Sequence, residues 1–139
     1  MAIEKREIQN VIDKYRLTSD GLPRGDEKDK PLVVDDALVS QVEWCLQFYA
    51  TLDAKTLRRW YSYTLKHAVE QFTKDQGSPA YIRNVAAIIA AAKRGFTIRP
   101  APQTHYFMSS ERLPVPIPTC NVWVYLPRQL QPTLAKEAA

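Results

Sequence analysis

The stretch that decides the fold is residues 53–95, which read DAKTLRRWYSYTLKHAVEQFTKDQGSPAYIRNVAAIIAAAKRG. Apolar side chains recur in it at three- and four-residue intervals, the period of a helix that packs on a core. Two helices are predicted, over 54–75 and 79–94. Their ends are marked by residues typical of caps and first turns, namely Asp53, Gly77, Ser78 with Pro79, and Gly95. The stretch is therefore predicted to be a helical hairpin with a tight turn.

Positive charge is concentrated in this hairpin. Residues 53–99 hold nine basic and three acidic side chains, a local excess of +6. Residues 1–52 carry −3 and residues 100–139 carry +1, within a chain whose net charge is +4. The basic residues are Lys55, Arg58, Arg59, Lys66, Lys74, Arg83, Lys93, Arg94 and Arg99. A basic hairpin indicates either an anionic partner or a charged surface that serves only solubility.

Two further helices are predicted in the N-terminal half. Apolar residues lie at helical spacing over 3–15 and over 35–51. Between them, residues 18–31 contain glycine, proline and a run of alternating charges, which predicts a solvated, charged loop. Together with the hairpin, these segments give four helices.

After Gly95 the apolar pattern changes from helical to alternating. Short strands are predicted at 96–99, 105–108 and 121–125. Three prolines impose an extended course before the last strand, at Pro114, Pro116 and Pro118. Residues 127–139 are predicted to be a tail. The expected fold is a single domain, 1–139, of the α-rich α+β class: about four helices with the basic hairpin at the centre, then a small antiparallel β element.

The two hairpin helices differ in the faces that they present. The first has a wide apolar stripe that includes Trp60 and Tyr61, which we interpret as core residues rather than as a platform for nucleic-acid bases. The second has a buried stripe that starts at Tyr81. Its opposite face consists of Ala87, Ala90 and Ala91 between Arg83 and Arg94. Such a face allows close approach of a nucleic-acid groove, a partner helix or another helix of the same chain.

Composition places the chain among globular proteins. Hydrophobic residues make up 45% and charged residues 24% of the sequence. The longest apolar run, near 85–92, is far shorter than the roughly 20 residues of a membrane span, and no apolar run follows the charged N-terminus as in a secretory signal. Cys45 and Cys120 show neither disulfide nor metal-site spacing. We therefore expect a cytoplasmic protein with reduced thiols and no membrane partner.

One sequence pattern resembles that of a known group of proteins. Ser62-Tyr63-Thr64-Leu65-Lys66-His67 is followed by Tyr81-Ile82-Arg83-Asn84, by Ala90-Ala91-Ala92, by Gly95-Phe96 and, loosely, by Phe107 to Ser110. Over residues 60–110 the chain is similar to small proteins of phages and other bacterial mobile elements. Their pattern runs Ser-Tyr-Gly-Leu-Lys-His, Tyr-Ile-Ser-Asn-Gly, Ala-Ala, Gly-Phe or Gly-Tyr, and Phe-x-x-Ser. This chain departs from it at Thr64 and Val85, where the pattern has glycine.

The resemblance implies a phage, plasmid or prophage setting and no particular activity. In such a setting, small proteins commonly regulate DNA or bind and block a host protein. The sequence itself contains no GxxxxGK, GxGxxG or paired-carboxylate motif. His67 and Glu70 lie three apart but lack a visible third metal ligand, and neither cysteine has a local nucleophile motif. We therefore expect a non-enzymatic protein with no catalytic residue, metal or cofactor.

Two binding functions remain. In the favoured one, the protein binds and modulates a host or mobile-element protein, such as a nucleic-acid-handling complex, through the alanine–arginine face, Tyr63 and segment 114–118. In the alternative, residues 54–94 form a helix-turn-helix-like hairpin that binds DNA, with bases read from the start of its second helix and phosphates held by the other cations. The candidate binding residues are Arg58, Arg59, Tyr63, Lys66, Arg83, Asn84, Lys93 and Arg94. The sequence leaves open which partner is bound and whether the chain acts as a monomer or a homodimer.

Overall fold

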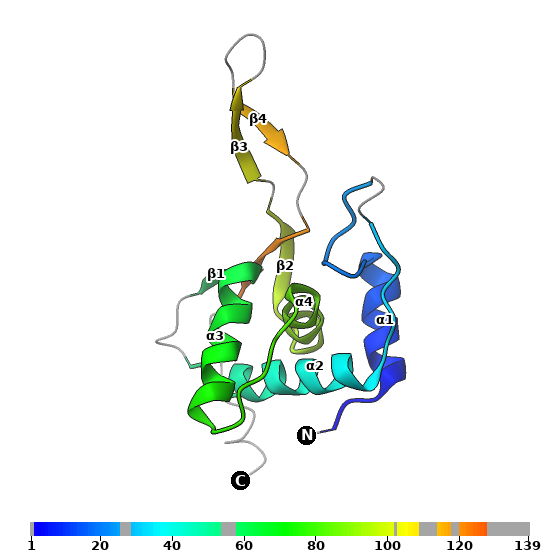
Figure 1. Cartoon of the computed structure of the whole chain (residues 1–139), viewed down its shortest axis with the longest axis vertical. Helices are drawn as coiled ribbons and strands as arrows, with labels where there is room; N and C mark the ends of the chain where they lie inside the picture. Colours follow the sequence, from blue (N-terminus) through cyan, green and yellow to red (C-terminus); the bar gives the residue numbers. More distant parts are fainter. Residues whose placement is uncertain are drawn as a thin grey trace.

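Four helices and five strands are present in the part of the chain that the computed structural model describes (Figure 1). That part comprises residues 2–25, 29–53, 58–101, 103–108, 114–117 and 120–127, with the backbone alone described for 103–108 and 114–117. The helices are α1 (Lys5–Tyr15), α2 (Asp36–Tyr49), α3 (Ser62–Asp75) and α4 (Asn84–Lys93). The strands are β1 (Arg59–Tyr61), β2 (Thr97–Pro100), β3 (Gln103–Met108), β4 (Pro114–Ile117) and β5 (Val122–Tyr125). The predicted α-rich α+β fold, with four helices and a small antiparallel sheet, is confirmed.

The strands form two separate antiparallel pairings. In the three-stranded sheet, β5 lies between β1 and β2, so that Val124 pairs with Trp60 on one side and with Ile98 on the other. Strands β3 and β4 pair only with each other and project as a ribbon away from the helices (Figure 1). The predicted strands at 96–99, 105–108 and 121–125 therefore correspond to β2, β3 and β5. The proline segment, expected to be merely extended, supplies β4.

Helix α4 is the centre of the core. Its residues Val85–Ala91 have no exposed surface, and α1, α2, α3 and β2 pack around it (Figure 1). The small alanine side chains let these neighbours approach the α4 backbone closely, and the Tyr49 hydroxyl donates a buried hydrogen bond to the Ala87 carbonyl at 2.9 Å. The face of Ala87, Ala90 and Ala91 is thus covered by the chain's own helices. Of the three alternatives left open for this face, another helix of the same chain is the one observed, so the face is not available to a binding partner.

The first helix of the hairpin begins later than predicted. Residues 59–61 form β1, and α3 begins at Ser62, whereas residues 54–57 and their predicted helical turn lie outside the described part of the chain. The physical reason is long-range pairing, because β1 aligns with β5 about sixty residues further along the chain. Trp60 and Tyr61 therefore lie on a strand. Trp60 is half-buried against the core, and the Tyr61 ring lies edge-on to Trp123 at 5.3 Å between centroids.

The second helix of the hairpin also begins later, at Asn84 instead of residue 79. The preceding backbone is held extended because side chains of α2 and α3 take three of its N–H groups. These bonds run from Ala80 to Thr73 Oγ1 (3.0 Å), from Ile82 to Glu70 Oε2 (3.0 Å) and from Arg83 to Gln41 Oε1 (2.8 Å). Tyr81, predicted to start a buried helical stripe, is consequently 69% exposed.

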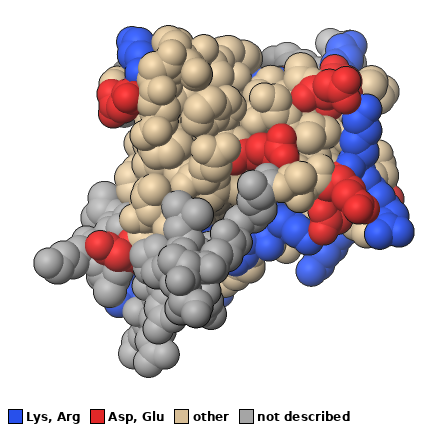
Figure 2. All heavy atoms as spheres, turned by 90° about the horizontal axis from the view of Figure 1, so that it is seen from below, with Lys and Arg blue, Asp and Glu red and all other residues tan. Residues whose placement is uncertain are grey.

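Both predicted helix ends are confirmed. Gly77 (φ 80°) and Gly95 (φ 87°) follow α3 and α4 in the left-handed conformation that glycine adopts readily. On the face of the molecule shown in Figure 2, basic and acidic side chains are interspersed, mainly where α1 lies, and much of the remaining surface is uncharged. Positive charge therefore forms no continuous field on this face. No helix in the described part of the chain is long and apolar enough to cross a membrane.

Candidate binding cleft

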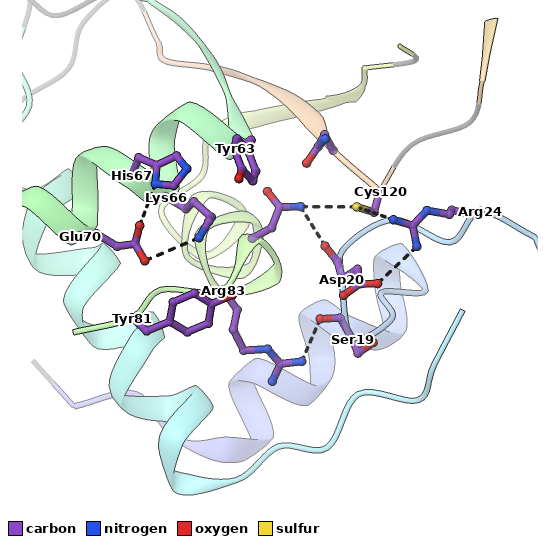
Figure 3. A pocket seen from close by; sticks show the side chains of 12 residues that line it. Ser19, Asp20, Arg24, Tyr63, Lys66, His67, Glu70, Tyr81, Arg83 and Cys120 are labelled. Atoms are coloured by element: carbon purple, nitrogen blue, oxygen red, sulfur yellow. Dashed lines mark hydrogen bonds and ion pairs between the residues drawn. The ribbon is translucent and has the colours of Figure 1, made fainter. Parts of the chain in front are cut away.

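A cleft with a volume of about 590 Å³ lies at the N-terminal end of α4 (Figure 3). Four segments that are distant in sequence form its walls, and we call it the α4 cleft. Its lining residues are Ser19, Asp20 and Arg24 from the loop after α1; Tyr63, Lys66, His67 and Glu70 from α3; Tyr81, Arg83 and Asn84 at the start of α4; and Cys120 and Asn121 before β5.

Lys66 is a nearly buried cation in the α4 cleft, with only 7% of its side chain exposed. Its Nζ lies 3.6 Å from Glu70 Oε2. It also lies 4.7 Å from the centroid of the Tyr81 ring and 5.5 Å from that of Tyr63, at distances typical of cation–π contacts. No acceptor within the described residues is close enough to hydrogen-bond this ammonium group. The Lys66 ammonium group is therefore in contact with one carboxylate and two aromatic rings.

Glu70 organises the α3 side of the cleft. Its Oε2 accepts the Ile82 N–H and its Oε1 lies 2.8 Å from His67 Nδ1. Burial raises the pKa of Glu70, but the hydrogen bonds from Ile82 and His67 and the charge of Lys66 outweigh this effect and leave the pKa below its ordinary value. Glu70 is thus a carboxylate at neutral pH. Because a carboxylate only accepts hydrogen bonds, it favours the His67 tautomer that carries its proton on Nδ1.

Two exposed tyrosines stand on either side of Lys66 (Figure 3). Tyr63 is 51% exposed and Tyr81 is 69% exposed. Tyr63 is also held edge-on against the His67 ring, with 4.7 Å between centroids. Large aromatic groups that project from a folded surface next to a hollow are typical of binding sites.

The loop after α1 closes the opposite wall. Arg83 Nη2 donates to the Ser19 carbonyl and Asn84 Nδ2 donates to the Asp20 carbonyl, each at 2.8 Å. The Leu22 N–H bonds to the Cys120 carbonyl at 2.9 Å. Residues 18–25, which fall in the loop predicted to be solvated, are therefore fixed against the end of α4.

The end of α4 leaves polar groups without partners. Arg83 is the N-cap and its side chain does not cap the helix. Within the described part of the chain, the N–H groups of Asn84 and Val85 meet no acceptor; Val85 is fully buried, so that of the two only Asn84 lines the cleft, and the buried Asn84 Oδ1 has no hydrogen-bond partner. A helix N-terminus carries partial positive charge. The cleft thus combines a buried cation with the positive end of a helix.

The thiols offer little nucleophilic chemistry. Burial raises the pKa of Cys120, although the positive charge of Arg24 nearby opposes the increase. Burial also raises the pKa of Cys45, which lies wholly inside the core. Both are free cysteines. Because the thiolate is the reactive species, neither group is primed for attack at neutral pH.

The structure brings four of the eight predicted binding residues together in the α4 cleft, namely Tyr63, Lys66, Arg83 and Asn84. The other four lie elsewhere. Arg58 precedes β1, Arg59 stacks over the Trp123 ring at 4.3 Å, Lys93 pairs with Glu7 at 3.0 Å, and Arg94 lies at the opposite end of α4 over Phe96. The eight residues do not form one surface.

The list of candidate binding residues predicted from the sequence omits other lining residues, above all His67, Glu70 and Tyr81. His67 and Tyr81 do belong to the quoted motif, which could have pointed to them. The loop residues Ser19, Asp20 and Arg24 carry no comparable signal, because only the fold brings them to α4.

The DNA-binding alternative required an exposed second helix. A recognition helix presents one side to a DNA groove, whereas α4 is covered on all sides between Val85 and Ala91. Arg83 and Asn84, expected to contact DNA, are instead bonded to the loop after α1.

No family model matches the chain, and neither a curated protein nor a solved structure matches it. Within the described residues, no group of three or more His, Cys, Asp or Glu side chains is placed to hold a metal ion. His67 and Glu70, considered above as a metal pair, are instead in contact with each other.

Proposed function

We propose that this protein is a non-enzymatic accessory protein that binds another protein through the α4 cleft and modulates it. The observation that carries the proposal is the pair of exposed tyrosines, Tyr63 and Tyr81, beside the nearly buried Lys66. Tyrosine is enriched at protein interfaces and among the residues that dominate their binding energy. On the surface of a monomer, an exposed tyrosine ring keeps its apolar atoms in contact with water, and this exposure does not stabilise the fold.

The sequence resemblance supports the same surface. Tyr63, Lys66, His67, Tyr81 and Asn84 belong to the motif quoted for mobile-element proteins, and all five line the α4 cleft. We therefore propose a host or mobile-element protein as the partner, with a phage, plasmid or prophage setting. The two free cysteines are compatible with a cytoplasmic location.

A capture experiment tests this proposal. The wild-type chain, the double variant Tyr63→Ala/Tyr81→Ala and the control Val33→Ala are used as baits in a lysate of the host cell. Val33 is also 69% exposed but does not line the cleft, so it controls for loss of any exposed apolar group. A partner retained by the wild type and the control, and lost from the double variant, is expected. Equal capture by all three baits would contradict the proposal.

A nucleic-acid binding measurement distinguishes the DNA-binding alternative from protein binding. Affinity for random duplex DNA is measured at two salt concentrations, because binding through phosphate contacts weakens steeply with salt. We expect no such salt-dependent binding. Tight, strongly salt-dependent binding that survives the double tyrosine change would favour the DNA-binding alternative over the cleft.

A further inference from the structure

We propose that the α4 cleft recognises an acidic side chain, Asp or Glu, within an extended segment of the partner protein. This inference rests on the proposed function and names the chemistry of the contact. Lys66 and the N-terminus of α4 hold the carboxylate oxygens, and Tyr63 and Tyr81 contact the apolar atoms on either side of it.

The Lys66 ammonium group is the first reason. It carries three N–H donors, yet the described residues offer it no hydrogen bond, only the 3.6 Å ion pair with Glu70 and the two tyrosine rings. Because only 7% of the Lys66 side chain is exposed, an anion in the cleft would interact with this ammonium group more strongly than with a cation on the open surface. An incoming oxygen acceptor would complete the coordination of this ammonium group, and the cleft gives it a path to Lys66.

The end of α4 is the second reason. Asn84 is the first residue of the helix and lines the same cleft as Lys66. Helix N-termini favour anions because their unpaired N–H groups point outward and the helix dipole is positive there. Lys66 comes from α3 and this terminus from α4, so two independent elements present positive charge to one hollow.

Charge balance selects the kind of anion. The cleft is lined by three cations, Arg24, Lys66 and Arg83, and by two carboxylates, Asp20 and Glu70, which leaves a net charge of +1 with His67 neutral. A single carboxylate neutralises this charge. A phosphate group carries about −1.5 to −2 at neutral pH and would overcompensate it next to Glu70. The cleft therefore matches a monoanion better than a phosphoryl group.

The two tyrosines indicate that the bound carboxylate belongs to a side chain within a segment of the partner and not to the partner's C-terminus. Both rings approach the same ammonium group, from opposite sides of it in Figure 3. A segment that passes over Lys66 can contact both rings with the residues before and after its acidic residue. A C-terminal carboxylate would have chain on one side only and would leave one tyrosine without a partner.

Four short peptides test this inference on the full-length, isotope-labelled chain by nuclear magnetic resonance. The first is acetyl-Ala-Val-Glu-Val-Ala-amide. Two others carry Gln or phosphoserine in place of Glu, and the last carries Gln and a free C-terminal carboxylate. We expect the Glu peptide to shift the amide signals of Asn84, Val85 and His67 and to bind at least about ten-fold more tightly than the Gln peptide. Equal binding of the Glu and Gln peptides would overturn the inference, as would tighter binding of the phosphoserine or free-carboxylate peptide.

Variants of the cleft assign the effect to its residues. Lys66→Met should abolish the preference for Glu, Lys66→Arg should retain it, and the control Lys14→Met, on α1 and not among the residues that line this cleft, should leave it unchanged. Lys66→Arg keeps the test valid if Lys66→Met does not fold. Glu70→Gln raises the net charge of the cleft by one unit and should move the preference toward phosphoserine, which a merely structural role of Glu70 would not do. If the preference for the Glu peptide over the Gln peptide is the same in all of these variants, the inference is refuted.

Failure of this inference and failure of the proposed function give different results. Capture of a partner that depends on Tyr63 and Tyr81 but not on Lys66 would leave the proposed function in place and refute carboxylate recognition. If the Glu peptide binds in a way that depends on Lys66, but the double tyrosine variant captures the same proteins as the wild type, carboxylate recognition stands and the proposed function is refuted.

Discussion

The middle of α4 and its N-terminal end are about one helical turn apart, yet they differ in how their polar groups are satisfied. In the middle, residues 85–91 are wholly buried, and the Ala87 carbonyl accepts a bond from Tyr49. At the end, Lys66 is held within the described residues by an ion pair and two aromatic rings and not by a hydrogen bond, Asn84 Oδ1 has no partner there, and two tyrosines project into solvent. The contrast indicates that the middle of α4 serves stability, whereas its end departs from optimal packing, as functional sites commonly do.

The largest effect is expected in the middle of α4. Ile89 is fully buried there, so Ile89→Ala should lower the free energy of unfolding by about 2–5 kcal/mol, the range for truncation of a large buried aliphatic side chain. Urea denaturation of the purified variant measures this. Partner capture by the folded fraction should be unchanged. A loss below about 1 kcal/mol would show that α4 is not the centre of the core.

The next effect concerns the loop that joins the two regions. Gly21 has φ 140°, and a Cβ at this position would collide with the Cys120 carbonyl oxygen. Gly21→Ala should therefore cost about 1–3 kcal/mol in stability and move the loop away from the end of α4. Hydrogen exchange of the Leu22 amide, which is bonded to Cys120, should accelerate.

Gly25 offers a matched control for Gly21. Its φ is 79°, so alanine is disfavoured there too, but a Cβ would meet no atom within 4 Å. Gly25→Ala should then show only the backbone effect of a left-handed residue, about 1 kcal/mol, and should leave the exchange of the Leu22 amide unchanged. Equal effects at both glycines would mean that close packing on Cys120 contributes nothing.

The same contrast shows what could be predicted from the sequence. Features set by neighbouring residues were predictable: the helix ends at Gly77 and Gly95, and the change from helical to alternating pattern after Gly95. Features set by distant contacts were not. Strand β1 exists because β5 pairs with it, and α4 begins late because Thr73, Glu70 and Gln41 bind the backbone before it.

The residues of the cleft were likewise predictable where local sequence identified them and not where distant contacts decide. Tyr63, Lys66, Arg83 and Asn84 were predicted because their residue types and their motif stand out locally. Tyr81 was misassigned to a buried stripe, because helical periodicity was extended into a segment that the fold holds extended. The alanines of α4 suited either an exposed or an enclosed face, and only the positions of the other helices decide between the two.

A smaller effect is expected at Glu70, which joins α3 to the segment before α4. The pKa of Glu70 is lower in the folded chain than its ordinary value of 4.5. Its ionised form therefore stabilises the fold fully above about pH 4.5, and this contribution is lost as the pH falls through the folded-state pKa. Glu70→Gln should cost about 1 kcal/mol at pH 7. The difference from the wild type should shrink below pH 4.5, as thermal melting across the pH range would show. A constant difference would mean that the charge of Glu70 plays no part.

The smallest effect on stability, with the largest on binding, is expected at Tyr81. Its side chain is 69% exposed, and its neighbours Ala80 and Ile82 already anchor the backbone through Thr73 and Glu70. Tyr81→Ala removes the contact of the ring with Lys66 and should therefore lower the free energy of unfolding by only about 0.5–1 kcal/mol, while partner capture falls. This is the reverse of the pattern expected for Ile89→Ala, and together the two variants test whether the middle and the end of α4 have separate roles. Measurement of melting and capture on the same sample decides it. If Tyr81→Ala lowers stability as much as a core truncation and leaves capture intact, the tyrosine is a structural residue and the cleft has lost its main support as a binding site.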